Sequence, residues 1–240
     1  AVESSPQDVG RAYYEATVKY WQNWIHNVSM PFEWQDVIIR AAITLRMNTF
    51  YDTGAIIAAV TTSIPGSPDA KHNRDYRYSW VRDSYFVVSA LNRLGATGTM
   101  ERYLQYIGNI IADSKGRPFQ PVYGIHRNAD LEEKIAPDLA GYNDMGPVRI
   151  GNSAYRETQN DVYGSAILAC TQAFFDQRLH RPADRNVFAD LERLGEEAVA
   201  RFNQPDADIW HRNEKEQVHT FSSVMCWAAC DRLAAIAKEL

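Results

Sequence analysis

A chain of 240 residues, of which 45% are apolar, can bury a substantial core, most simply as one domain. Its net charge is −5 and no basic block interrupts the mixture of charges, which argues against a nucleic-acid partner. No apolar run is long enough to span a bilayer, and the first ten residues lack the pattern of a signal peptide. The three cysteines have no framework spacing, so we expect buried free thiols and a cytoplasmic location. They are Cys170, Cys226 and Cys230.

Helical periodicity dominates the first half of the chain. Apolar residues recur every three or four positions in four segments, which predicts four amphipathic helices. The stripes consist of Tyr13, Ala16, Tyr20 and Trp24; of Ile38, Ala41, Ala42 and Leu45; of Phe86, Val87, Ala90, Leu91 and Leu94; and of Met100, Tyr103, Leu104, Ile107, Ile110 and Ile111. Residues 54–63 and 119–125 are short apolar or β-branched stretches, which we predict to be extended.

Three further helices are predicted in the second half. We expect a long helix over residues 153–178, capped by Asn152 or Ser153. Periodic apolar residues mark the other two: Phe188, Leu191, Ala198, Val199 and Phe202, and then Phe221, Met225, Ala228, Ala229, Leu233 and Ile236. The sequence therefore predicts an all-α protein.

One segment combines sugar-binding residue types. Residues 73–83 read NRDYRYSWVRD, with three aromatic residues, three arginines and two carboxylates at a predicted helix start. Aromatic faces can stack on a sugar ring, while Asp and Arg can bind its hydroxyls. On composition alone we would interpret the aromatic residues as core and Arg82–Asp83 as a local ion pair, because aromatic stripes usually belong to a core.

Four motifs of the chain, in order, resemble those of glycoside hydrolase family 15, the group of glucoamylases, glucodextranases and bacterial trehalases. Residues 73–83 resemble the family signature N-W-D-Y-R-Y-x-W-x-R-D, and residues 51–59 resemble the TGAIVAA segment upstream of it. Residues 141–164 contain GY, PVRIGN and QNDVYG, and residues 208–232 contain DIW, HTFS and WAACDR. The resemblance covers roughly residues 10–240.

The resemblance implies an (α/α)6 barrel, in which six inner helices are surrounded by six outer ones. The chain supplies about six barrel helices, so we expect about half of a barrel. Residues 1–32 would be a linker segment and helix, and residues 33–240 a partial catalytic domain. Half of a barrel leaves apolar side chains uncovered, so we expect self-association through its open edge.

The resemblance also implies an inverting hydrolysis with two carboxyl groups, a general acid and a general base. The family's acid is the Glu after Trp in D-x-G-[IL]-W-E, whereas residues 206–211 read DADIWH, so His211 occupies its position. The base belongs to a motif that the chain does not contain. An imidazolium can donate a proton near neutral pH, but a cation beside a developing oxocarbenium ion raises the barrier. We therefore interpret His211 as an inert polar replacement.

The positions that bind the sugar in the family are retained. The resemblance implies that Arg82 and Asp83 bind hydroxyls of the terminal glucose. It also implies that Tyr76, Trp80 and Trp210 form the walls of the same subsite.

Two more motif residues are ambiguous, because a ligand contact and a structural role suit them equally. They are Arg149 and Asp161. Three positions depart from the family, with Arg74 in place of Trp, Gly66 in place of Glu and Asp208 in place of Gly.

Two functions from different classes follow. The chain is either part of an exo-acting hydrolase of α-linked glucosides (starch-type glucans, isomalto-dextrins or trehalose) or a catalytically silent carbohydrate-binding homologue. A polysaccharide lyase using Tyr76, Arg77 and His211 is remote. We expect an α-glucoside as partner, with no nucleic acid, membrane, metal or cofactor, because His211 and His219 lack a specific ligand spacing.

Overall fold

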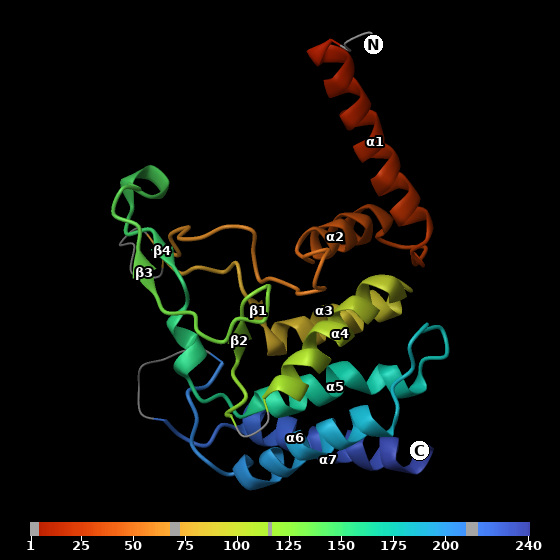
Figure 1. Cartoon of the computed structure of the whole chain (residues 1–240), viewed down its shortest axis with the longest axis vertical. Helices are drawn as coiled ribbons and strands as arrows, with labels where there is room; N and C mark the ends of the chain where they lie inside the picture. The colour runs from red at the N-terminus through yellow and green to blue at the C-terminus, as the bar shows by residue number, and fades with distance from the viewer. Residues whose placement is uncertain (1–4, 68–72, 115–116, 210–215) are drawn as a thin grey trace.

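The computed structural model describes residues 5–67, 73–114, 117–209 and 216–240, and these contain seven α-helices and two small sheets (Figure 1). The predicted all-α class is confirmed. The helices are α1 (Pro6–His26), α2 (Gln35–Met47), α3 (Val81–Arg93), α4 (Thr97–Asp113), α5 (Asp161–Phe175), α6 (Arg185–Arg201) and α7 (Thr220–Glu239).

Helices α3 to α7 form the packed body, in which α5 is central. Helix α5 packs against α3 on one side and α7 on the other, while α4 and α6 contact it from a second layer. Eleven of its fifteen residues are buried, because its small and apolar residues cover the whole helix circumference. Gly164 lets α7 approach closely, since a Cβ at this position would lie 2.2 Å from the Met225 carbonyl oxygen. Two layers of helices are what about half of an (α/α)6 barrel requires.

The helices of the α3, α5 and α7 layer begin at the same end of the body. Arg82 and Asp161, both in first turns, form an ion pair at 3.4 Å. In α7, the Cys226 thiol donates to the carbonyl oxygen of Asn160, the residue that precedes α5. Three helix starts therefore meet, and they gather the side chains of their first turns.

Helix α1 extends away from this body (Figure 1). The Ser5 side chain accepts a hydrogen bond from the Asp8 amide, and Pro6 occupies the first turn, as is typical of a helix start. None of its residues is buried. It contacts α2, where Arg46 donates to the Tyr20 hydroxyl at 3.1 Å.

The two sheets have two strands each and lie on the side of the helix starts. Strand β1 (Ser79–Trp80) pairs antiparallel with β2 (Val122–Tyr123), and β3 (Lys134–Ile135) pairs antiparallel with β4 (Arg149–Ile150). Isolated bridges join Thr49 to Ile56 and Thr62 to Asp75. The stretches predicted to be extended are thus only partly strand.

The predicted helix over residues 153–178 is wrong at both ends. The Asn152 side chain accepts from the Ala154 amide and caps a short 3-10 helix, η2 (Ser153–Arg156). Glu157 is then extended, and α5 begins only at Asp161 and ends at Phe175. The chain uses residues 157–160 to reach the meeting point of the helix starts.

All three cysteines are free thiols, two of them buried as predicted. Burial raises the pKa of Cys170 to about 12 and that of Cys226 to about 11, so both stay protonated at neutral pH. Cys230 is only half-buried, because it lies on a more open face of α7.

Candidate functional site

The second half of the 73–83 segment places an aromatic ring beside a guanidinium. Trp80 ends strand β1 and precedes α3, and the Val81 amide donates to the Pro121 carbonyl at 3.0 Å. The Trp80 side chain is buried, and the Arg82 guanidinium carbon lies 5.8 Å from its ring centre. The strand pairing thus fixes the ring, and the first turn of α3 brings the cation over it.

Three groups surround the Arg82 guanidinium. Its Nη1 donates to Gln159 Oε1 at 2.8 Å and lies 3.4 Å from Asp161 Oδ2. Its Nη2 lies 3.8 Å from Asp83 Oδ2. Asp161 is buried, whereas the Asp83 side chain is 57% exposed. Gln159 and Asp161 therefore fix Nη1 of the guanidinium, while the exposed carboxylate of Asp83 lies near Nη2.

Burial determines the electrostatics of this pair. Desolvation raises the pKa of Asp161, and the positive charge of Arg82 partly opposes that rise. A buried carboxylate with a cationic partner keeps that cation in place, because separating them would leave an uncompensated charge.

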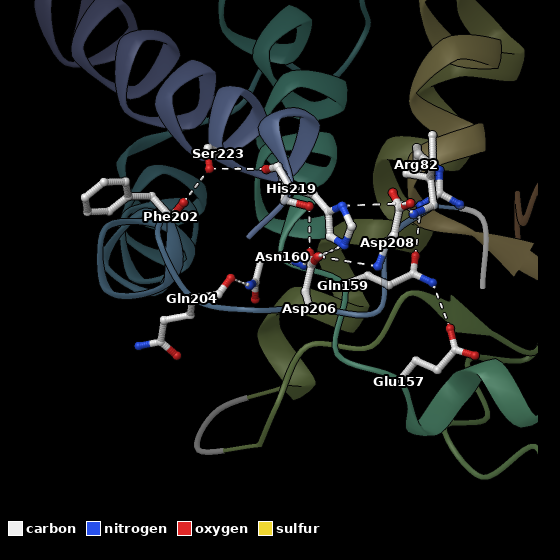
Figure 2. Close-up of polar contacts among 12 residues, drawn as sticks. Arg82, Glu157, Gln159, Asn160, Phe202, Gln204, Asp206, Asp208, His219 and Ser223 are labelled. Carbon is white, nitrogen blue, oxygen red and sulfur yellow. Dashed lines mark hydrogen bonds and ion pairs between the residues drawn. The ribbon is translucent and has the colours of Figure 1, made fainter. Parts of the chain in front are cut away.

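Asp206 ties the starts of α5 and α7 together (Figure 2). Its buried Oδ2 accepts from the Asn160 amide at 2.8 Å and from the Ser222 hydroxyl at 2.6 Å. The Asn160 side chain donates to the Gln204 carbonyl at 3.2 Å. An otherwise unpaired helix-start amide and a first-turn hydroxyl are thus satisfied by one carboxylate.

His219 lies between two carboxylates in the same view (Figure 2). Its Nε2 is 3.9 Å from Asp206 Oδ1, and its Nδ1 is 3.9 Å from Asp208 Oδ2. Asp208 has a φ of 62°, a left-handed conformation that favours glycine, and its Oδ1 accepts from the Ile209 amide at 2.6 Å. The backbone thus gives a reason for the glycine that the family carries at this position.

The first half of the 73–83 segment has a structural role. Asp75 is fully buried and accepts from Arg77 Nε at 2.9 Å, from Arg77 Nη2 at 2.8 Å and from the Gly151 amide at 3.2 Å. The Asn73 side chain donates to the Met145 carbonyl at 2.7 Å. These contacts attach the segment to residues 145–152.

The contacts of Arg82 described above include none of the other predicted site residues, two of which lie outside the described residues. Tyr76 is 41% exposed, on the solvent side of the segment. Arg149 lies in strand β4 and forms an ion pair with Glu133. Trp210 and His211 lie outside the described residues.

A cavity of about 640 Å³ adjoins the network at Gln159. Its wall includes the aromatic side chains of Phe119, Tyr123, Tyr155 and Tyr163. Neither Trp80 nor Arg82 lines it, so it is distinct from the pocket predicted around those residues.

Sequence reasoning missed three residues of this polar network: Gln159, which contacts Arg82, and Asn160 and Asp206, which join the helix starts. Gln159 and Asn160 stand in a motif that the sequence singled out, and Asp206 stands in the motif around Trp210. Gln159 lies 77 positions from Arg82, and Asn160 lies 46 positions from Asp206, so only the motif membership could have marked them.

Comparison with known proteins identifies the class. The sequence model of the family described as "Glycosyl hydrolases family 15" matches residues 35–240, and the chain belongs to this family.

Particular relatives are trehalases. The chain is 35% identical over 226 residues to a trehalase of Mycobacterium tuberculosis, and the matched region covers 93% of this chain and 33% of that protein. It is 31% identical over 232 residues to a trehalase of Thermoplasma volcanium (94% and 35%), and 27% identical over 227 residues to trehalase 2 of Sulfolobus acidocaldarius (95% and 39%). The chain thus spans about a third of the length of the curated relatives it matches. No solved structure matches it significantly.

Among the residues that the structure describes, no group of three or more His, Cys, Asp or Glu side chains is arranged to hold a metal ion. Every helix in these residues is too short or too polar to span a lipid bilayer.

Proposed function

We propose that the chain contributes the glucose-binding half of an exo-acting, inverting hydrolase of α-linked glucosides, with trehalose as the leading substrate. Family membership and the names of the relatives support the class of substrate. Which glucoside is cleaved depends on parts of the site that the chain does not contain.

One observation carries the proposal, namely the arrangement around Arg82. Its guanidinium is fixed against the Trp80 ring by Gln159 and Asp161, and it is accompanied by the exposed carboxylate of Asp83. A guanidinium donates and a carboxylate accepts, so the pair can bind adjacent sugar hydroxyls while the aromatic residues provide an apolar wall. In the proposed subsite Tyr76 and Trp210 complete the wall. Arg149 is structural, because its side chain is engaged by Glu133.

Catalysis requires more than this chain. The position of the family's general acid carries His211, and the chain lacks the family motif to which the base belongs. A general acid contributes about 10²–10⁴-fold, and without the base no carboxylate orients the attacking water. We propose that the chain alone binds the sugar without hydrolysing it.

The second candidate function, a catalytically silent carbohydrate-binding homologue, is favoured by His211. A cationic donor opposes the positive charge that develops on the sugar. The two candidates share the binding site and differ only in whether a complete barrel hydrolyses the glucoside.

The domain division belongs to the same proposal. Residues 1–32 form a linker segment whose helix α1 has no buried residue, and residues 33–240 form the partial catalytic domain. Self-association through the open barrel edge remains a prediction, supported by the 67% exposure of Trp227 and the 50% exposure of Val224 on α7. A cytoplasmic location also remains a prediction.

The binding experiment is calorimetric titration of the purified chain with trehalose, maltose and isomaltose. Asp83→Ala should weaken sugar binding by at least tenfold, because it removes the hydroxyl acceptor beside Arg82. Asp231→Ala is the matched control, since Asp231, like Asp83, pairs with an arginine next to it in the sequence (here Arg232), but lies twelve positions into α7. Equal binding by both variants would contradict the proposed subsite.

The catalytic part is tested by glucose release. We expect none from the chain, and none from His211→Glu in the chain alone. Glucose release by the wild-type chain that Asp83→Ala abolishes would show that His211 and the half-barrel suffice for hydrolysis.

A further inference from the structure

Asp206 is a fully buried carboxylate that has no place in the proposed chemistry. It comes from the loop after α6, yet most of its contacts are to other elements. Besides the Asn160 amide and the Ser222 hydroxyl, its backbone amide donates to the Gln217 carbonyl at 3.0 Å. The Ala207 amide donates to the Thr158 carbonyl at 2.9 Å. Hydrogen bonds therefore join the Asp206 loop to the segment that precedes α5 and to the segment that precedes α7.

The Asn160 amide lies between two residues that contact Arg82. Gln159 precedes it and accepts from Arg82 Nη1, while Asp161 follows it and forms the buried ion pair. Fixing this one amide fixes the direction in which both side chains leave the backbone. The amide that Asp206 holds is thus flanked by the two residues that contact Arg82, and Asp206 itself is hydrogen-bonded to that amide.

We infer that Asp206 is a positioning residue for the sugar site: by holding the Asn160 amide, it sets the orientation of the Arg82 guanidinium. The inference rests on the proposed function in that Arg82 binds the sugar. A purely structural role would have a different consequence, because it would affect folding stability and leave Arg82 where it is.

Asp206→Asn tests this inference in the chain as it exists. The variant has nearly the same size but loses the charge and one acceptor oxygen, which weakens the bonds from Asn160 and Ser222. We expect the side-chain NMR signals of Arg82, assigned by their loss in Arg82→Lys, to move toward those of a freely rotating arginine. Trehalose binding should weaken by about tenfold or more, the usual consequence of a lost charge-assisted hydrogen bond.

Asp176→Asn is the matched control. Asp176 is a second nearly buried carboxylate, with 7% side-chain exposure, at the opposite end of α5. It accepts from the Arg178 amide at 3.0 Å and from Arg178 Nε at 2.9 Å. This variant should lower the melting temperature as well, but leave the Arg82 signals and sugar affinity unchanged within about twofold.

A second variant with a smaller change tests the inference if Asp206→Asn does not fold. Ser222→Ala removes one donor to Asp206 and leaves the carboxylate in place. We expect a folded protein whose Arg82 signals move in the same direction by a smaller amount.

The outcomes separate the inference from the proposed function. The Arg82 signals are recorded without ligand, so they report positioning even if no sugar binds. Unchanged Arg82 signals in a folded Asp206→Asn, or in Ser222→Ala where the first variant does not fold, would overturn the inference. Altered signals in a chain whose wild type fails to bind trehalose would support the inference and overturn the proposed function.

Discussion

Asp75 and Asp83 stand eight residues apart in the same segment, but their surroundings are opposite. Asp75 has no exposed side-chain surface and accepts hydrogen bonds from the Arg77 guanidinium and from the backbone amides of Arg77 and Gly151. Asp83 is 57% exposed and lies 3.8 Å from one arginine nitrogen. At one end of the segment an aspartate thus holds loops together through hydrogen bonds, and at the other end an aspartate is an exposed hydrogen-bond acceptor.

The comparison extends to the regions around them. Around Asp75, hydrogen bonds of the Asn73 and Asp75 side chains to residues 145–152 join two loop segments. Around Asp83 the backbones of α5 and α7 touch directly at Gly164, and buried polar groups fix only the helix starts. Residues of one family motif can therefore have different roles. The exposed fraction of the side chain distinguishes the structural Asp75 from the exposed Asp83.

A large effect that sharpens this comparison is expected from Asp75→Asn. It removes the charge of a fully buried carboxylate that pairs with the half-exposed Arg77, and it leaves the Gly151 amide without its charged acceptor, so the free energy of unfolding should fall by about 2 kcal/mol. Asp83→Asn should change it by less than about 0.5 kcal/mol, because its side chain is exposed. Urea denaturation measures both, and equal losses would remove the distinction between the two ends.

Gly164→Ala tests the helical region. The new Cβ would lie 2.2 Å from the Met225 carbonyl oxygen, so α5 and α7 must separate, and overpacking of this kind costs about 2–3 kcal/mol. Gly108→Ala in α4 is the matched control, since nothing lies within 4 Å of its Cβ position. That control should instead stabilise the chain by about 0.5–1 kcal/mol, because alanine favours a helix. Similar free energies of unfolding of the two variants would show that the space between α5 and α7 can accommodate a methyl group.

The sequence was sufficient to predict helices in which apolar residues recur every three or four positions over several turns. Six of the seven helices begin and end near their predicted stripes, because burial of one face decides where they form. The seventh, α5, was predicted too long at both ends. Residues 153–160 take hydrogen bonds from distant segments, such as Gln120 Nε2 to the Tyr155 carbonyl and the Ala207 amide to the Thr158 carbonyl. No local pattern encodes such partners.

The candidate site shows the same division. The Trp80–Asp83 end could be recognised because its residue types and helix start are contiguous. Asp206 could not be connected with Arg82, because it acts through an amide 46 positions earlier in the chain. Asp208 looked like simple divergence from the family's glycine, and only its φ of 62° reveals the conformational demand at that position.

Asp208 offers a smaller effect. In Asp208→Ala, a Cβ stays in the left-handed region without the side-chain acceptor for the Ile209 amide, whereas Asp208→Gly removes the strain. Both variants lose that hydrogen bond, so we expect the glycine variant to be more stable than the alanine variant by about 1 kcal/mol. Thermal unfolding of the pair measures the difference, and an alanine variant as stable as the glycine variant would argue against a left-handed backbone at residue 208.

The smallest effect concerns pH and the buried Asp161. Its pKa is raised by burial, against the opposing charge of Arg82. Between the ordinary carboxyl pKa of about 3.9 and this raised value, folded Asp161 retains a proton that the unfolded chain has released. The folded state then binds more protons than the unfolded state, so the contribution of Asp161 to the free energy of unfolding falls as the pH rises. Asp161→Asn lacks this contribution, and its stability relative to wild type should therefore rise with pH across that window.

Asp176→Asn should show the opposite sign, which makes it the control. Hydrogen bonding from the Arg178 side chain lowers the pKa of Asp176, so folded Asp176 releases its proton before the unfolded chain does. Its contribution to stability is present above the ordinary carboxyl pKa and is lost as the pH falls through the lowered one. Relative to wild type, Asp176→Asn should therefore become less stable as the pH rises through that lower window. Parallel pH profiles for the two variants would mean that burial and the Arg82 charge do not set the ionisation of Asp161, and that its carboxylate is not the buried partner that holds Arg82 in place.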